Sequence, residues 1–208
     1  MNNIEAFDKA ISFITRADVN DLIAWLKNDT DFFIAPASSK FHGNYEGGLL
    51  EHSLNVVRLA LHNFNFIVKQ KPELEYLRES VIIAALFHDV CKVNYYVKKK
   101  KFKKDEQSKW VEYDSYETDD KMPLGHGEKS VYLISKYFKL TDAEALAIRW
   151  HMGATEFSVN ITASPQSFAY YAAIEHPLVR LIHVADMMSL SLEEKKEPIY
   201  RPANFDNK

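Results

Sequence analysis

The chain has 208 residues, of which 47% are hydrophobic and 26% charged, a balance that predicts one compact domain over residues 1–208 and excludes a disordered or fibrous chain. Its formal net charge of -3 argues against a protein that coats nucleic acid, and its only cysteine, Cys91, excludes an internal disulfide and a cysteine-cluster metal site. We therefore expect any metal to be held by nitrogen and oxygen. No apolar run approaches the roughly eighteen residues of a membrane span, and a secretion-signal pattern is missing from the first residues, so we expect a cytoplasmic protein without a membrane partner.

Most of the chain has the apolar periodicity of helices. Apolar residues recur at spacings of three and four, and only six glycines and seven prolines interrupt them. We expect helices at residues 4–14, 18–28, 49–69, 73–90, 127–139, 142–152, 166–174 and 177–190. Thr141 and Glu144 have the spacing of a capping box at the start of one helix, and Gly153 is placed to end it.

The segment at residues 93–122 differs from its surroundings. It is rich in aromatic and β-branched residues, with a polar stretch near its middle that favours a turn. This composition predicts a β-hairpin inserted between two helices. The predicted fold class is therefore an all-α bundle with one inserted hairpin.

Several polar side chains occupy positions where the helical pattern predicts burial. His52 lies outside the polar stripe of its helix, on the apolar side. His88 and Asp89 follow seven consecutive apolar residues, and a helix that is apolar all round is a central one. Asp186 lies in another largely apolar helix. Because an unpaired buried carboxylate costs several kcal/mol, Asp89 and Asp186 need partners.

Two further histidines stand at predicted helix ends. His126 precedes a helix start between two glycines, and His151 closes the capped helix. Each alone is more typical of a core or capping histidine. Together with the residues above, they make four histidines and two aspartates suited to one or two divalent ions. The candidate ions are manganese, iron, nickel, cobalt and zinc, with magnesium as a further option.

At these residues the sequence resembles the HD-domain superfamily of metal-dependent phosphohydrolases, whose pattern is H, then HD, often two further H, then D. The pattern matches, in order, His52, His88–Asp89, His126, His151 and Asp186. The stretch 41–53 is similar to the one before the first ligand in bacterial 3'-5' exoribonucleases that join an OB-fold to an HD domain. Residues 88–92 are similar to the family's HD-x-x-K word. Unlike those exoribonucleases, this chain shows no OB-fold before the domain and a single histidine at position 151.

The resemblance implies a helical HD-domain bundle and a set of metal ligands. His52, His88, Asp89 and Asp186 would hold one ion, and His126 with His151 would hold a second, with Asp89 bridging the two. Two ions that share a carboxylate activate water for attack on phosphorus.

Other residues are candidates for catalysis and substrate binding. Asp89 is the predicted catalytic carboxylate. Lys92, one turn further on, would neutralise a phosphate oxygen, or it is an ordinary lysine at a helix C-terminus. His42 and Tyr45 are candidates for the entrance of the site, and Arg180 would bind phosphate or pair with an acid.

The sequence thus predicts a phosphohydrolase acting on a small phosphorylated substrate, with a nucleotide favoured. One alternative is a 3'-5' exonuclease on short RNA or DNA, and another is a di-iron oxygenase of the same fold. A degenerate nucleotide sensor is disfavoured because all six ligands are present. The hairpin has six clustered lysines, which would suit a nucleic-acid strand, but seven acids follow them and favour pairing across the hairpin. The lysines are Lys98, Lys99, Lys100, Lys101, Lys103 and Lys104.

Overall fold

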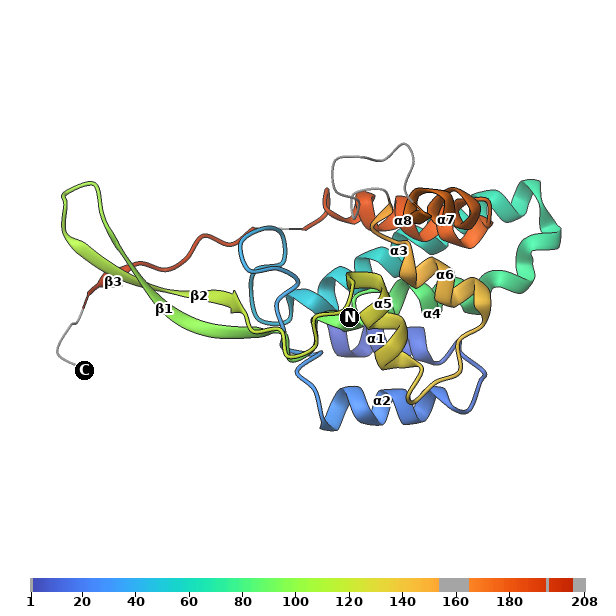
Figure 1. Ribbon diagram of the computed structural model, residues 1–208, viewed down its shortest axis with the longest axis horizontal. Helices are drawn as coiled ribbons and strands as arrows, with labels where there is room; N and C mark the ends of the chain where they lie inside the picture. The colour runs from blue at the N-terminus through green and yellow to red at the C-terminus, as the bar shows by residue number, and fades with distance from the viewer. Residues whose placement is uncertain (1, 154–164, 194, 204–208) are drawn as a thin grey trace.

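The computed structural model describes residues 2–153, 165–193 and 195–203. A body of helices occupies one end of the molecule, and a long hairpin projects from it (Figure 1). The C-terminal segment leaves the helical body and runs along the hairpin. The all-α class with an inserted hairpin is therefore confirmed. Within the described residues, no helix is both long and apolar enough to cross a membrane.

Eight α-helices make up the described helical body. They are α1 (Asn3–Ile11), α2 (Val19–Asn28), α3 (Gly48–Gln70), α4 (Arg78–Phe87), α5 (His126–Ile134), α6 (Asp142–Arg149), α7 (Pro165–Ile174) and α8 (Pro177–Ser189). Two short 3-10 helices flank α4, at Pro72–Leu77 and Val90–Lys92. The capping box predicted for α6 is present, with the Thr141 side chain accepting from the Glu144 backbone.

The prediction of one helix over residues 73–90 is wrong. A 3-10 helix that starts with a proline occupies Pro72–Leu77, and only Arg78–Phe87 is α-helical. At the other end the chain leaves the α conformation at Asp89, whose φ is -103° and ψ is 19°. Asp89 therefore lies outside the regular helix, whereas His88 caps the C-terminal end of α4. The helices predicted at 127–139 and 142–152 also end earlier, at Ile134 and Arg149.

Helix α4 is the centre of the fold. All seven residues from Val81 to Phe87 are buried, and α4 packs against α3, α6 and α8. A helix that is apolar on every side can be stable only when other elements cover it all round. The C-terminal end of α4, where His88 and Asp89 follow, therefore lies inside the protein.

The hairpin consists of β1 (Tyr96–Lys104) and β2 (Trp110–Thr118), which pair antiparallel with Lys100 opposite Asp114. A third strand, β3 (Arg201–Pro202), pairs with β2 and was not predicted. The expected pairing of lysines with acids is present. Lys99 and Lys101 each lie 3.0 Å from a Glu117 carboxylate oxygen, and the Lys100 ammonium lies 3.1 Å from Glu112.

Gly127 allows α5 to approach the end of α6. A Cβ on this residue would lie 2.1 Å from the carbonyl oxygen of Arg149, which no side chain can tolerate. The close approach of these two backbones brings His126, at the start of α5, beside His151, just after α6: their ring centroids are 5.2 Å apart. Gly127 thus serves the packing of α5 against the end of α6.

Candidate metal centre

The structure brings all six predicted metal ligands into one cluster. They come from α3, the end of α4, the start of α5, the turn after α6, and α8. Five of them are buried, and the His126 side chain is 32% exposed. Their donor atoms form overlapping groups in which every atom lies within 4.8 Å of the others. These groups are His52 with His88 and Asp186, His88 with Asp89 and His151, and Asp89 with Cys91 and His126.

Asp89 lies between two pairs of histidines. Its Oδ2 atom is 3.3 Å from His52 Nε2 and 3.5 Å from His88 Nε2. Its Oδ1 atom is 2.8 Å from His126 Nε2 and 3.5 Å from His151 Nε2. Each carboxylate oxygen therefore faces a different pair of imidazole nitrogens.

Asp186 completes the first of these two groups. Its Oδ1 atom lies 3.3 Å from His52 Nε2 and 3.8 Å from His88 Nε2. Oδ2 of Asp89 lies near the same two nitrogens, so His52 Nε2 and His88 Nε2 each face an oxygen of both aspartates. Such a mixed set of nitrogen and oxygen donors suits a divalent transition metal.

Two of the histidines are held with Nε2 free to bind a metal. His88 Nδ1 donates to the Ala85 carbonyl at 2.8 Å, and His151 Nδ1 donates to the Ile148 carbonyl at 2.7 Å. Because a carbonyl only accepts, the proton of each neutral ring must be on Nδ1, which leaves a lone pair on Nε2. His151 Nε2 is buried without a hydrogen-bond partner, and His52 Nε2 lies 3.0 Å from His88 Nε2. An unsatisfied buried nitrogen and two facing imidazoles fit a bound cation.

The pKa shifts in the cluster reflect the close approach of carboxylates to imidazoles and to Lys92. Burial alone would raise the pKa of Asp89, but the charge of Lys92 and a hydrogen bond from His126 hold it well below its usual value. Burial alone would lower the pKa of His126, but its hydrogen bonds to Asp89 and Cys91 raise it to about 9. Protons on His52 and His126 therefore balance the carboxylates, and a metal cation would replace them on binding.

A sulfur atom, that of Cys91, lies beside the predicted nitrogen and oxygen ligands. This Sγ atom lies 3.3 Å from His126 Nδ1 and 3.7 Å from His126 Nε2. Cys91 is buried and two residues from Asp89, so the 3-10 turn after α4 carries its thiol to the same side as the carboxylate. A single cysteine cannot form a cysteine cluster, but it can add one sulfur to a histidine and aspartate site.

Glu193 contacts the cluster although the sequence analysis did not single it out. Its Oε1 atom lies 2.6 Å from His52 Nδ1, and its side chain is only 2% exposed. The Glu193 carbonyl in turn lies 3.0 Å from His42 Nδ1. His42 is thus placed to hold the chain just after α8. The sequence does not indicate that Glu193 is buried, because it belongs to a polar stretch beyond the last helix that resembles a solvated terminus.

The cluster opens to solvent next to His126. A cavity of about 210 Å³, here called the mouth cavity, is lined by Cys91, Lys92, Tyr95, Asp120, Leu124, His126 and Lys129. Tyr95 and Asp120 stand just outside the two ends of the hairpin, so the base of the hairpin borders the site. The Lys92 ammonium lies 2.6 Å from Asp89 Oδ2, and this carboxylate raises the pKa of Lys92 despite the opposing effect of burial.

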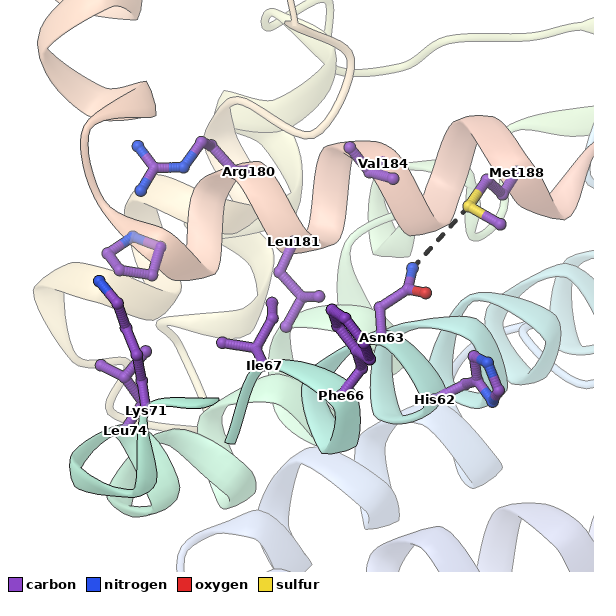
Figure 2. A pocket seen from close by; sticks show the side chains of 11 residues that line it. His62, Asn63, Phe66, Ile67, Lys71, Leu74, Arg180, Leu181, Val184 and Met188 are labelled. Atoms are coloured by element: carbon purple, nitrogen blue, oxygen red, sulfur yellow. Dashed lines mark hydrogen bonds between the residues drawn. The ribbon is translucent and has the colours of Figure 1, made fainter. Parts of the chain in front are cut away.

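The structure does not bring Arg180 to the metal ligands. Arg180 donates to the carbonyls of Ile174 and Glu175 and lines an apolar groove of about 560 Å³ between α3 and α8 (Figure 2). This groove is larger than the mouth cavity, but none of the six ligands lines it. Tyr45 donates from its hydroxyl to Glu51 at 3.1 Å.

Comparison with known proteins identifies the family. The HD domain profile matches residues 49–190, and the chain belongs to this family of metal-dependent phosphohydrolases. The chain is also similar to the dihydroneopterin 2',3'-cyclic phosphate phosphodiesterase of Methanocaldococcus jannaschii, with 34% identity over 85 residues. That match covers 41% of this chain and 31% of the relative, so the chain matches about a third of the relative's length. No solved structure gives a significant match.

Proposed function

We propose that this protein hydrolyses a phosphoester of a nucleotide at a centre that binds two divalent ions. The single observation that carries the proposal is the position of Asp89, whose two oxygens face two separate pairs of imidazole nitrogens. A carboxylate with this geometry is suited to bridge two cations. The family supports phosphoester hydrolysis as the reaction.

The chain's own residues divide into two ligand sets. His52, His88 and Asp186, with one oxygen of Asp89, would hold the first ion, and His126 and His151, with the other oxygen, would hold the second. Bound ions would supply an activated water and offset the charge that builds on the phosphoryl oxygens. His126 is exposed at the mouth cavity, which supports entry of the substrate through this cavity, on the side of the second ligand set.

Two observations support a small substrate over a nucleic-acid strand. Three of the six hairpin lysines are paired with acids, so they are less available to follow a phosphate backbone. The similar archaeal enzyme acts on dihydroneopterin 2',3'-cyclic phosphate, a small phosphodiester. Cyclic phosphodiesters therefore belong among the first substrates to test.

The proposal is tested by metal analysis combined with a substrate screen. Protein purified without added metal is expected to contain up to two transition-metal ions per chain and to hydrolyse a mononucleotide or a 2',3'-cyclic nucleotide. Removal of the metal with a chelator should abolish turnover, and manganese should restore it, because imidazole binds manganese and later transition metals better than it binds magnesium.

The same screen includes short RNA and single-stranded DNA. Faster cleavage of these strands than of any mononucleotide would replace our proposal with the exonuclease. Two iron ions with oxygen consumption and no phosphoester hydrolysis would replace it with the di-iron oxygenase.

Lys92→Ala is expected to lower kcat by about 100-fold while leaving the metal content unchanged. The Lys92 ammonium lies at the mouth cavity beside Asp89, where it can offset charge on a phosphoryl oxygen, and removal of one such donor costs about 100- to 1,000-fold. Steady-state kinetics and metal analysis of the same preparation check this. Lys92→Arg, which keeps the charge, should retain more of the activity. If Lys92→Ala loses bound metal and turnover to the same extent, Lys92 holds Asp89 in place and does not act on the substrate phosphate.

A further inference from the structure

A second cavity lies away from the metal ligands, where three separate segments meet. It has a volume of about 400 Å³ and is lined by the loop before α3, the hairpin, and residues 195–200. We call it the lysine cleft. Residues 195–203, the C-terminal strap, run from the helical body to β3 beside the hairpin (Figure 1). None of the six metal ligands lines the cleft, and its volume lies in the range of small-molecule sites.

The lysine cleft has a concentration of positive charge that contrasts with the charge of the whole chain. Five lysines and only two acids line it, in a protein whose formal net charge is -3. The lysines are Lys40, Lys98, Lys101, Lys195 and Lys196, and the acids are Asp114 and Glu197. Cations gathered from three segments around one concavity repel each other, so a bound anion would be favourable there.

Three acids at or beside the cleft are paired with cations, two of which are lysines of the cleft itself. Glu117 lies 3.0 Å from the Lys101 ammonium, and Glu197 lies 3.8 Å from the Lys195 ammonium. Asp114 lies 3.7 Å from the guanidinium of Arg201. Among the described residues, Lys40, Lys98 and Lys196 have no ion-pair partner, so the cleft has a surplus of positive charge.

Aromatic side chains and polar tethers accompany the lysines. Tyr113, Tyr116 and Tyr200 line the cleft, and the rings of Tyr113 and Tyr200 pack edge to face with centroids 5.4 Å apart. The strap wall is fixed by Asn44, whose side chain donates to the Lys196 carbonyl at 3.0 Å and accepts from the Lys196 backbone at 2.9 Å. Lysines beside aromatic rings on a tethered wall suit phosphate groups attached to a planar base.

We propose that the lysine cleft is a second ligand site, distinct from the metal centre, that binds the phosphate groups of a nucleotide. Lys40 and Lys98 contact the phosphates from opposite segments, and the tyrosines face the base. The volume of the cleft and the pairing of the neighbouring lysines favour a mononucleotide over a strand. This site is additional to the proposed function, since it uses none of the residues assigned to hydrolysis.

The test is a binding titration of the full chain with ATP in the presence of a chelator, so that the metal centre contributes nothing. We expect saturable binding of one ATP per chain. The double variant Lys40→Ser/Lys98→Ser should weaken it at least tenfold, because each substitution removes a charged hydrogen-bond donor to a phosphate oxygen. A thermal melt of each variant confirms that it is folded.

The matched control is the double variant Lys99→Ser/Lys100→Ser. It removes the same charge from the same region, but these lysines pair with Glu117 and Glu112 and do not line the cleft. It should change ATP affinity less than threefold. Equal losses in the two double variants, or no saturable ATP binding, would overturn the proposal.

A hexanucleotide of uridine, titrated under the same conditions, distinguishes the strand from the nucleotide. Binding to a strand should weaken with salt with a log-log slope of about -0.7 for each phosphate contacted. A hexanucleotide that binds more tightly than ATP, with a slope corresponding to several phosphates, would contradict the mononucleotide site. Because no metal or turnover is involved, failure of this proposal leaves the proposed hydrolysis untouched, and the reverse also holds.

Discussion

Asp89→Ala is expected to remove both metal ions and all measurable hydrolysis. Asp89 presents one oxygen to His52 and His88 and the other to His126 and His151, so each ligand set loses its shared donor. Loss of a residue that only supports a metal ligand typically costs 10- to 100-fold in affinity. Removal of a shared ligand should therefore cost more than about 100-fold at each ion. Metal analysis after gel filtration and a turnover assay on the same sample measure the two losses.

Asp186→Ala is the control for this experiment. Asp186 faces His52 and His88 but neither His126 nor His151 in the distances that define the cluster. This variant should therefore weaken one ion selectively, while Asp89→Ala weakens both. Circular dichroism confirms that each variant is folded. An Asp89→Ala protein that is folded and still binds two ions would rule out the bridging arrangement.

The helical body and the burial of two candidate ligands could be predicted from the sequence because each leaves a local signal. Burial of His52 follows from its position outside the polar stripe of α3, and burial of Asp89 from the seven apolar residues before it. The hairpin follows from composition, and the capping box of α6 from the spacing of Thr141 and Glu144. All these signals lie within a few turns of the residues that they place.

The features that could not be predicted depend on contacts between distant segments. Strand β3 has only two residues, too few to show any periodicity, and it exists because β2 offers an edge. Cys91 reaches His126 only because the chain leaves the α conformation at Asp89, which no local pattern indicates. Glu193 contacts His52 across 141 positions in the chain. A charged residue in a polar stretch has the same local pattern whether it is solvated or buried against a histidine.

Glu193→Ala is expected to weaken metal binding by about 10- to 100-fold, through His52. A metal-binding histidine is oriented by the acceptor at its other ring nitrogen, and such acceptors are worth about this much in affinity. The 2.6 Å contact between Glu193 Oε1 and His52 Nδ1 fixes a proton on Nδ1 and turns Nε2 toward Asp89 and Asp186. Glu193 is thus a positioning residue, and it lies beyond the end of the matched HD domain at residue 190.

The alternative partner of His52 limits the size of this effect. The Ser189 hydroxyl lies 3.3 Å from His52 Nδ1 and itself donates to the Asp186 carbonyl at 2.7 Å. It can accept a longer and weaker hydrogen bond when the carboxylate is removed. We therefore expect Glu193→Ala to retain the fold and some metal binding, in contrast to Asp89→Ala.

A calorimetric titration of the metal-free protein with manganese separates a positioning role of Glu193 from a general structural role. Glu193→Gln keeps an oxygen that accepts from His52 Nδ1, so it should recover most of the affinity that Glu193→Ala loses. Glu197→Ala removes an exposed carboxylate from the C-terminal strap, where it pairs with Lys195, and should bind manganese as the parent protein does. If Glu193→Ala and Glu197→Ala bind manganese equally well, Glu193 does not position His52. If the Glu193→Gln variant is folded but fails to restore affinity, the negative charge rather than the hydrogen bond is what the metal centre requires.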